Sequence, residues 1–402
     1  MKNIKVKKIN PLAILNLATF LQYQRFVMPI SFLFYIYNGL NFSDFILCQS
    51  IYCATCLLGK FMMGFIGDII SKKYVLIIAY ILFMVRVILW INFSGFWIVM
   101  TGEILYGLFK ALYRGNIDSY IYEYLEQKES GKEMTQKYGT WAFYTSLGSA
   151  LSCIAGVILY KYFGFKTILF IELITQIIAV LCLLLLPNTK IKYNKTPKAI
   201  NYVKNIFNGI KSVFSNSKIN YNVYYAAMLA GFTSIFVWNF QPLLKLSSAP
   251  VILYGVINFI NQIFRAIGGL CADKFALKFK NHIFVIEYIA VIVSFILLIA
   301  GYYINNYIFI FTALLIICIA IILFMIFNVF NVSNLHKNTQ DVNRATSASV
   351  NSFAEDFTSF FLLINFKFIY DKLGIHNTLA IFIILALFAL APVFAKRNTQ
   401  SV

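Results

Sequence analysis

The stretch GFIGDIISKK, residues Gly64–Lys73, lies between two long apolar runs and decides how the chain is organised. It places Asp68 and the adjacent Lys72 and Lys73 in one short connection, although the chain is 60% hydrophobic and only 12% charged. A related stretch, GLCADKFALK at Gly269–Lys278, occurs in the second half of the chain. A polar connection that recurs at equivalent places between apolar runs indicates an internal repeat, which is typical of secondary transporters.

The apolar runs predict an all-α integral membrane protein with twelve transmembrane helices. A soluble domain carries about 25% charged residues, twice the share found in this 402-residue chain. Runs of about 20 apolar residues, the length that crosses a bilayer core of about 30 Å, recur throughout. The first run reaches Asn38 and contains Arg25 without a small-residue cleavage site, so we expect a retained helix and not a signal peptide. The expected spans lie near residues 11–38, 44–67, 74–94, 97–121, 138–161, 165–186, 221–246, 250–271, 282–303, 306–328, 346–369 and 376–395.

A basic connection divides the spans into two groups of six. Residues 187–220 carry many lysines and no acidic residue, so we expect a cytoplasmic linker between bundles at 1–186 and 221–402. The net charge is +19, and most of the 34 lysines and arginines fall in connections on one side of the membrane. This asymmetry predicts a multi-pass protein of the cell membrane (inner or plasma membrane) with both termini in the cytoplasm. Because the bilayer accounts for these cations, nucleic acid is not an expected partner.

The cysteine and histidine pattern predicts neither a metal site nor a cofactor. Cys53 and Cys56 form a C-x-x-C pair, but they lie within an apolar span, and the three histidines are far apart. We therefore interpret the cysteines as small core residues. The chain contains no G-x-x-x-x-G-K-(S/T) nucleotide loop, and without clustered histidines or metal carboxylates it is not expected to be an enzyme.

The opening stretch resembles the signature loop of the major facilitator superfamily, G-x-x-x-D-(R/K)-x-G-(R/K)-(R/K). It departs from that pattern at Ile69 and Ser71. The resemblance implies two six-helix bundles related by a pseudo-two-fold axis, and a latch between the halves formed by the motif. The expected gating residues are Gly64, Asp68, Lys72, Lys73, Gly269, Asp273, Lys274 and Lys278. The structural alternative is a solvated helix end with no role in gating.

Charged and polar residues at membrane depth identify the candidate sites, because ionisable groups there face the bundle interior by default. Glu103, Lys110, Arg114 and Asp118 share one face of the fourth span. The resemblance places spans 1, 4, 7 and 10 around a central cavity, and hence Arg25, Lys110 and Arg114 near the substrate. The candidate substrate-binding residues are Gln22, Arg25, Lys60, Lys110, Arg114, Trp238, Asn239, Gln241, Asn258 and Arg265. The candidate proton-coupling acids are Glu103, Asp118, Glu355 and Asp356.

Several of these residues have a structural interpretation that stays open. Arg114 can form a structural salt bridge, Lys60 can pair with an acid, and Arg265 can serve as a partner of Asp273. Arg86 and Glu172 lie in helices that the resemblance places at the periphery, where we expect structural pairing.

The excess of cations in the first half favours an organic anion as the substrate, because guanidinium groups bind carboxylate or phosphate with two parallel hydrogen bonds. Candidates are a carboxylate, a phosphorylated metabolite or a siderophore, moved by a monomer through proton-coupled alternating access. The alternative is a proton-coupled multidrug efflux pump. The fifth span, GTWAFYTSLGSALSCIAG, lacks the proline of the Gly-Pro-x-x-Gly-Gly motif typical of such exporters, which weakens this alternative.

Overall fold

The computed structural model describes residues 10–127, 134–188, 217–279, 283–304, 306–313, 315–316 and 344–390, and these are helical with short connections. The amino-terminal half contains α1 (Pro11–Gln22), the 3-10 helix η1 (Met28–Ile30), α2 (Ser31–Tyr37), α3 (Phe42–Ile69), α4 (Lys72–Asn92), α5 (Phe96–Gln127) and α6 (Met134–Leu184). The carboxy-terminal half contains α8 (Ser217–Leu246), α9 (Ile252–Phe279), α10 (Ile283–Tyr303) and α12 (Arg344–Leu390). Helix α8 therefore begins inside the last part of the expected linker.

Two of these helices each contain a reversal at a glycine. Gly164 within α6 has φ of 73°, and Gly374 within α12 has φ of 72°, a conformation that side chains with a Cβ rarely adopt. At 1.5 Å per residue each of these elements is long enough to cross a bilayer twice. Five segments of the described helices are long and apolar enough to span a membrane: Phe42–Lys60, Lys72–Asn92, Gly139–Leu184, Val223–Leu246 and Asn351–Ala389.

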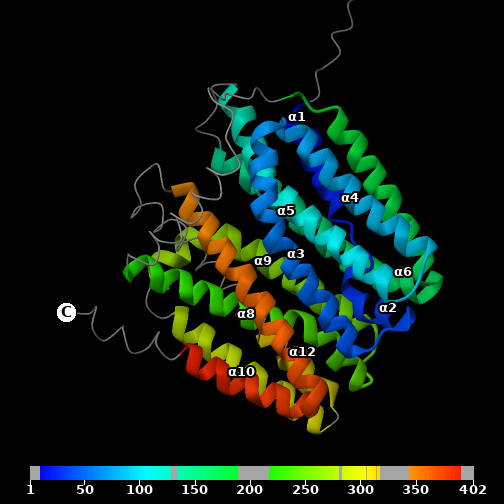
Figure 1. Ribbon diagram of the computed structural model, residues 1–402, viewed down its shortest axis with the longest axis vertical. Helices are drawn as coiled ribbons and strands as arrows, with labels where there is room; N and C mark the ends of the chain where they lie inside the picture. The colour runs from blue at the N-terminus through cyan, green and yellow to red at the C-terminus, as the bar shows by residue number, and fades with distance from the viewer. Residues whose placement is uncertain are drawn as a thin grey trace, which may run out of the picture.

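The two halves lie side by side as separate groups of helices, blue to green and green to red in Figure 1. Their main contacts are α3 against α12 and α6 against α9. Gly255 of α9 permits a close approach, because a Cβ at this position would lie 2.7 Å from the carbonyl oxygen of Cys153 on α6. The Phe42 and Tyr370 rings meet edge to face at 4.5 Å, which adds an aromatic contact between α3 and α12.

The first span is broken and not continuous over 11–38. Asn10 caps α1, since its side-chain oxygen accepts from the Leu12 N–H at 3.1 Å, and Pro11 follows at the first helical position. The helix ends at Gln22, and Pro29, which has no N–H to donate, lies in η1. Between them Arg25 contacts α5 and Val27 contacts α6, while η1 packs against α6 and α9. Protein therefore covers this irregular backbone, the arrangement in which a membrane protein tolerates such a break.

Candidate functional site

Arg25 lies in the break of the first span and is buried. Its guanidinium donates to the Gln22 side-chain oxygen at 2.8 Å and to the Tyr106 hydroxyl of α5. The same group lies over the rings of Tyr23 at 4.5 Å and Phe83 at 5.3 Å. Among the described residues no carboxylate forms an ion pair with Arg25, so neutral oxygens and aromatic faces hold this buried cation. Gln22 and Arg25, both expected from the sequence, are thus in direct contact.

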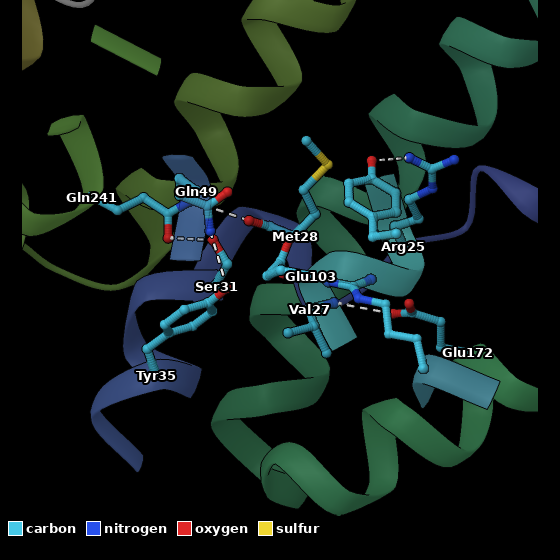
Figure 2. Close-up of polar contacts among 11 residues, drawn as sticks. Arg25, Val27, Met28, Ser31, Tyr35, Gln49, Glu103, Glu172 and Gln241 are labelled. Atoms are coloured by element: carbon cyan, nitrogen blue, oxygen red, sulfur yellow. Dashed lines mark hydrogen bonds and ion pairs between the residues drawn. The ribbon is translucent and has the colours of Figure 1, made fainter. Parts of the chain in front are cut away.

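A small cavity lined by both charged and apolar residues adjoins Arg25. Arg86 of α4 pairs with Glu103 of α5 at 3.0 Å, and Glu172 of α6 accepts from the Val27 N–H at 3.3 Å. The cavity has a volume of about 30 Å³, room for about two water molecules. Its lining consists of Arg25, Val27, Met28, Ser31, Gln49, Arg86, Glu103, Tyr106, Glu172 and Trp238. Figure 2 shows Val27 directed at Glu172, with Arg25 and Gln241 on opposite sides of Met28.

The remaining cations of the site are Lys110 and Arg114 of α5 and Arg265 of α9. Lys110 is partly buried, whereas Arg114 and Arg265 are exposed. Among the described residues none of the three forms an ion pair. They are close enough to influence one another electrostatically, since Lys110 interacts with both arginines and with Arg25. Cations from both halves therefore converge on one region.

Acidic residues of α12 face this region from the carboxy-terminal half. Asp356 forms an ion pair with Lys60 of α3, and Lys60 also donates to the Ser352 hydroxyl at 2.6 Å. Glu355 accepts from the Asn351 amide at 2.8 Å, and both acids interact electrostatically with Arg114. Lys60 thus pairs with an acid of the other half, which is the structural alternative noted above.

Gln241 of α8 contacts backbone of the other half. Its side-chain oxygen accepts from the Phe32 N–H at 2.9 Å and from the Ser31 hydroxyl at 3.4 Å, and its amide donates to the Met28 carbonyl at 3.1 Å. We call this end of the molecule, where Gln241 binds η1 and α2 and where Phe42 meets Tyr370, the closed end. Gln241 is buried, and its hydrogen-bonding groups are used in joining the two halves.

The other predicted substrate residues differ in their surroundings. Trp238 lines the small cavity. The amides of Asn239 and Asn258 donate to carbonyls of their own helices, at 2.6 and 2.9 Å. Asp118 is half-buried on α5. Glu103 forms an ion pair with Arg86. Sequence reasoning instead interprets Glu103 as a proton-coupling acid and places Arg86 in a peripheral helix.

The expected gating residues are only partly described. Lys73 donates to the Leu184 and Leu186 carbonyls at 2.8 and 2.6 Å, so it caps the end of α6 within its own half. Lys72 is buried at the start of α4. The side chains of the other six residues of this group lie outside the described residues: Gly64, Asp68, Gly269, Asp273, Lys274 and Lys278.

Sequence reasoning missed the aromatic side chains of the site and the position of two charged residues. Tyr23 and Tyr106 contact Arg25, yet they are two among 26 tyrosines, and no spacing distinguishes Tyr23. Arg86 and Glu172 line the cavity although they belong to helices expected at the periphery. A usable signal existed for Tyr106, because it lies one helical turn before Lys110 on the charged face of α5.

Comparison with known proteins gives a family match and close structural similarity. The family model of the Major Facilitator Superfamily matches residues 15–362. No curated protein matches this sequence. A variant of the nucleoside transporter NupG superposes with a TM-score of 0.78 at 16% identity, over 97% of this chain and 100% of that chain.

Two further solved structures have the same fold. A variant of the peptide transporter POT has a TM-score of 0.75 at 12% identity, over 96% of this chain and 94% of that chain. A bacterial homologue of the human lysosomal transporter Spinster, inward-facing and unoccupied, has a TM-score of 0.69 at 11% identity, over 95% of both chains. At these identities the similarity shows the fold and leaves the substrate of this chain open.

Proposed function

The chain belongs to the major facilitator superfamily and is a multi-pass membrane transporter and not an enzyme, and on this premise we propose that it moves a small organic anion across the cell membrane. The proposed mechanism is proton-coupled alternating access by a monomer with both termini in the cytoplasm. The proposed substrate is a carboxylate, a phosphorylated metabolite or a siderophore.

The observation that carries this proposal is the group of cations without ion pairs. Lys110, Arg114 and Arg265 repel one another, and within the described part of the chain no carboxylate lies within ion-pair distance of them. Charge inside a membrane protein is costly unless it is paired or faces water, and of these three cations Lys110 is the one that is partly buried. An anionic ligand would supply the missing countercharge, and with α5 and α9 in different halves it would contact both bundles.

The acids of α12 provide a physical route to coupling. Asp356 pairs with Lys60, and Glu355 and Asp356 both interact with Arg114. An arriving anion competes with these carboxylates for the same cations. A carboxylate that loses its cation lies in a poorly solvated place, which favours uptake of a proton. The proposed coupling is therefore symport of the anion with a proton, with Glu355 or Asp356 as the proton carrier.

Other acids are less suited to this role. Glu103 is buried and held by Arg86 at 3.0 Å, so its charge already has a partner. Asp118 is on the same helix as the cations but only half-buried. Movement of the two halves around the site would open the closed end, which is joined by Gln241 and by the close approach at Gly255.

Transport into proteoliposomes with an imposed pH gradient tests the proposal. We expect uptake of at least one class in a panel of labelled carboxylates, phosphorylated metabolites and siderophores. We expect Arg114→Ala to abolish it and Lys161→Ala, at an exposed lysine of α6, to leave it unchanged. Uptake of cationic dyes in place of every anion, with dependence on Glu103 or Asp118, would instead establish the efflux alternative, which the aromatic lining of the cavity favours.

A further inference from the structure

Four aromatic side chains form a connected group that begins at Lys110 and extends through Tyr106 to Tyr52 and Trp238. Tyr23 comes from the break in the first span, Tyr52 from α3, Tyr106 from α5 and Trp238 from α8. The Lys110 amine lies 5.8 Å from the ring centroids of both Tyr23 and Tyr106. Tyr52 stacks on Tyr106 with centroids 5.0 Å apart and planes at 18°, and Trp238 meets Tyr52 edge to face at 6.1 Å.

Tyr52 and Trp238 are less buried than the neighbouring rings of the aromatic core. Phe83 and Phe109, which also contact Arg25, are fully buried, so they can only pack against protein. Tyr52 and Trp238 are partly exposed, and Trp238 lines the cavity. Part of their ring surface is therefore not covered by protein.

Cation binding does not account for the placement of Tyr52 and Trp238 at this site. The described cations lie over other rings: Arg25 and Lys110 over Tyr23 and Tyr106, and none over these two. Within the described residues the indole N–H of Trp238 makes no hydrogen bond. A partly exposed pair of rings with a free donor, connected through Tyr106 to a cation without an ion pair, matches a flat ligand that carries negative charge.

We propose that the transported anion contains a planar aromatic ring, with its anionic group bound by Lys110 and its ring packed against Tyr52 and Trp238. This inference rests on the proposed function and narrows its substrate class to aryl carboxylates and aryl phosphates. Tyr106 contacts both Lys110 and Tyr52, so the charged and the aromatic parts of the site are adjacent. Because Trp238 belongs to the carboxy-terminal half, the ring of the ligand would also connect the two halves.

Equilibrium binding to the purified full chain tests the inference with matched pairs of anions. Each pair has equal charge and similar size, but only one member has an aromatic ring: benzoate and cyclohexanecarboxylate, phthalate and cyclohexane-1,2-dicarboxylate, phenyl phosphate and cyclohexyl phosphate. We expect the aromatic member of at least one pair to bind about tenfold more tightly, the scale of a good ring contact. Trp238→Leu and Tyr52→Leu should remove this preference without weakening the saturated member, and Trp238→Phe should retain it.

The matched control is Tyr122→Leu, at an exposed tyrosine of α5. It should leave every affinity unchanged. Equal binding of both members in all three pairs would overturn the aromatic proposal and leave the anion proposal standing. Binding of none of the six anions, together with binding of cationic dyes, would overturn both.

Discussion

Gln241 joins the two halves through backbone groups, so its replacement should shift the conformational equilibrium of the carrier. We expect Gln241→Leu, which keeps a side chain of similar volume, to open the closed end. The substitution removes the hydrogen bond from the Phe32 N–H at 2.9 Å and the bond to the Met28 carbonyl at 3.1 Å. Both backbone groups would be left without their partner in a buried place.

The expected magnitude follows from these two bonds. Each hydrogen bond contributes about 0.5–1.5 kcal/mol net, and a buried group left unsatisfied costs about 1–3 kcal/mol. Partial access of water to the loosened end reduces the second figure, so we expect a loss of about 2–4 kcal/mol for this conformation. A loss of about 2.8 kcal/mol would bring a population ratio of 99:1 close to equality.

Distances between two spin labels measure this shift. Labels at Tyr37 of α2 and Leu373 of α12, both exposed, lie near the closed end on opposite halves. In a background without other cysteines, Gln241→Leu should add a population with a longer distance. Asn239→Leu is the matched control, because this buried amide donates only within its own helix at 2.6 Å. An unchanged distance distribution in Gln241→Leu, or the same change in Asn239→Leu, would refute the reasoning.

Three further substitutions test the packing between and within the halves. Gly255→Ala should lengthen the same label distance, because the added methyl meets α6; an unchanged distance would show that the halves do not approach closely there. Lys60→Met should lower the free energy of unfolding by about 1–2 kcal/mol, which is less than the loss expected for a fully buried ion pair. Adding Asp356→Asn should recover part of this loss, as measured by thermal unfolding. Arg86→Met should lower the free energy of unfolding by about 3–5 kcal/mol, because it leaves the buried Glu103 carboxylate without its partner. Adding Glu103→Gln should restore most of this loss. A double variant no more stable than Arg86→Met would contradict the pairing.

The architecture was accessible from the sequence because it depends on local patterns. Apolar runs, the repeated polar connection and the basic linker each extend over neighbouring residues, and the family match confirms the fold they predict. The sequence predicts a first span that is continuous over 11–38, and it could not show the break near Pro29, which depends on packing of η1 against α6 and α9. The reversals at Gly164 and Gly374 fall between expected spans, as the sequence predicts.

The candidate site was accessible as a set of residues but not as a set of contacts. Intramembrane charges such as Lys60 and Asp356 can be recognised singly, yet their pairing joins residues far apart in the chain. Gln241 is a polar residue at membrane depth, which is typical of a substrate-binding residue. Only the arrangement of the two halves shows that it binds backbone groups. Aromatic residues make up 18% of the chain, so the sequence alone does not distinguish Tyr52 and Trp238, which are linked to Lys110 through Tyr106.

The affinity of the purified protein for an anion with and without the Lys110 charge tests the central claim most directly. With the most tightly bound anion of the panel, we expect Lys110→Met to raise Kd at least about tenfold, the loss of about 1.4 kcal/mol from one charged contact. Lys161→Met, at an exposed lysine outside the site, should leave Kd unchanged. An unchanged Kd in Lys110→Met would contradict the claim that cations without ion pairs bind the substrate.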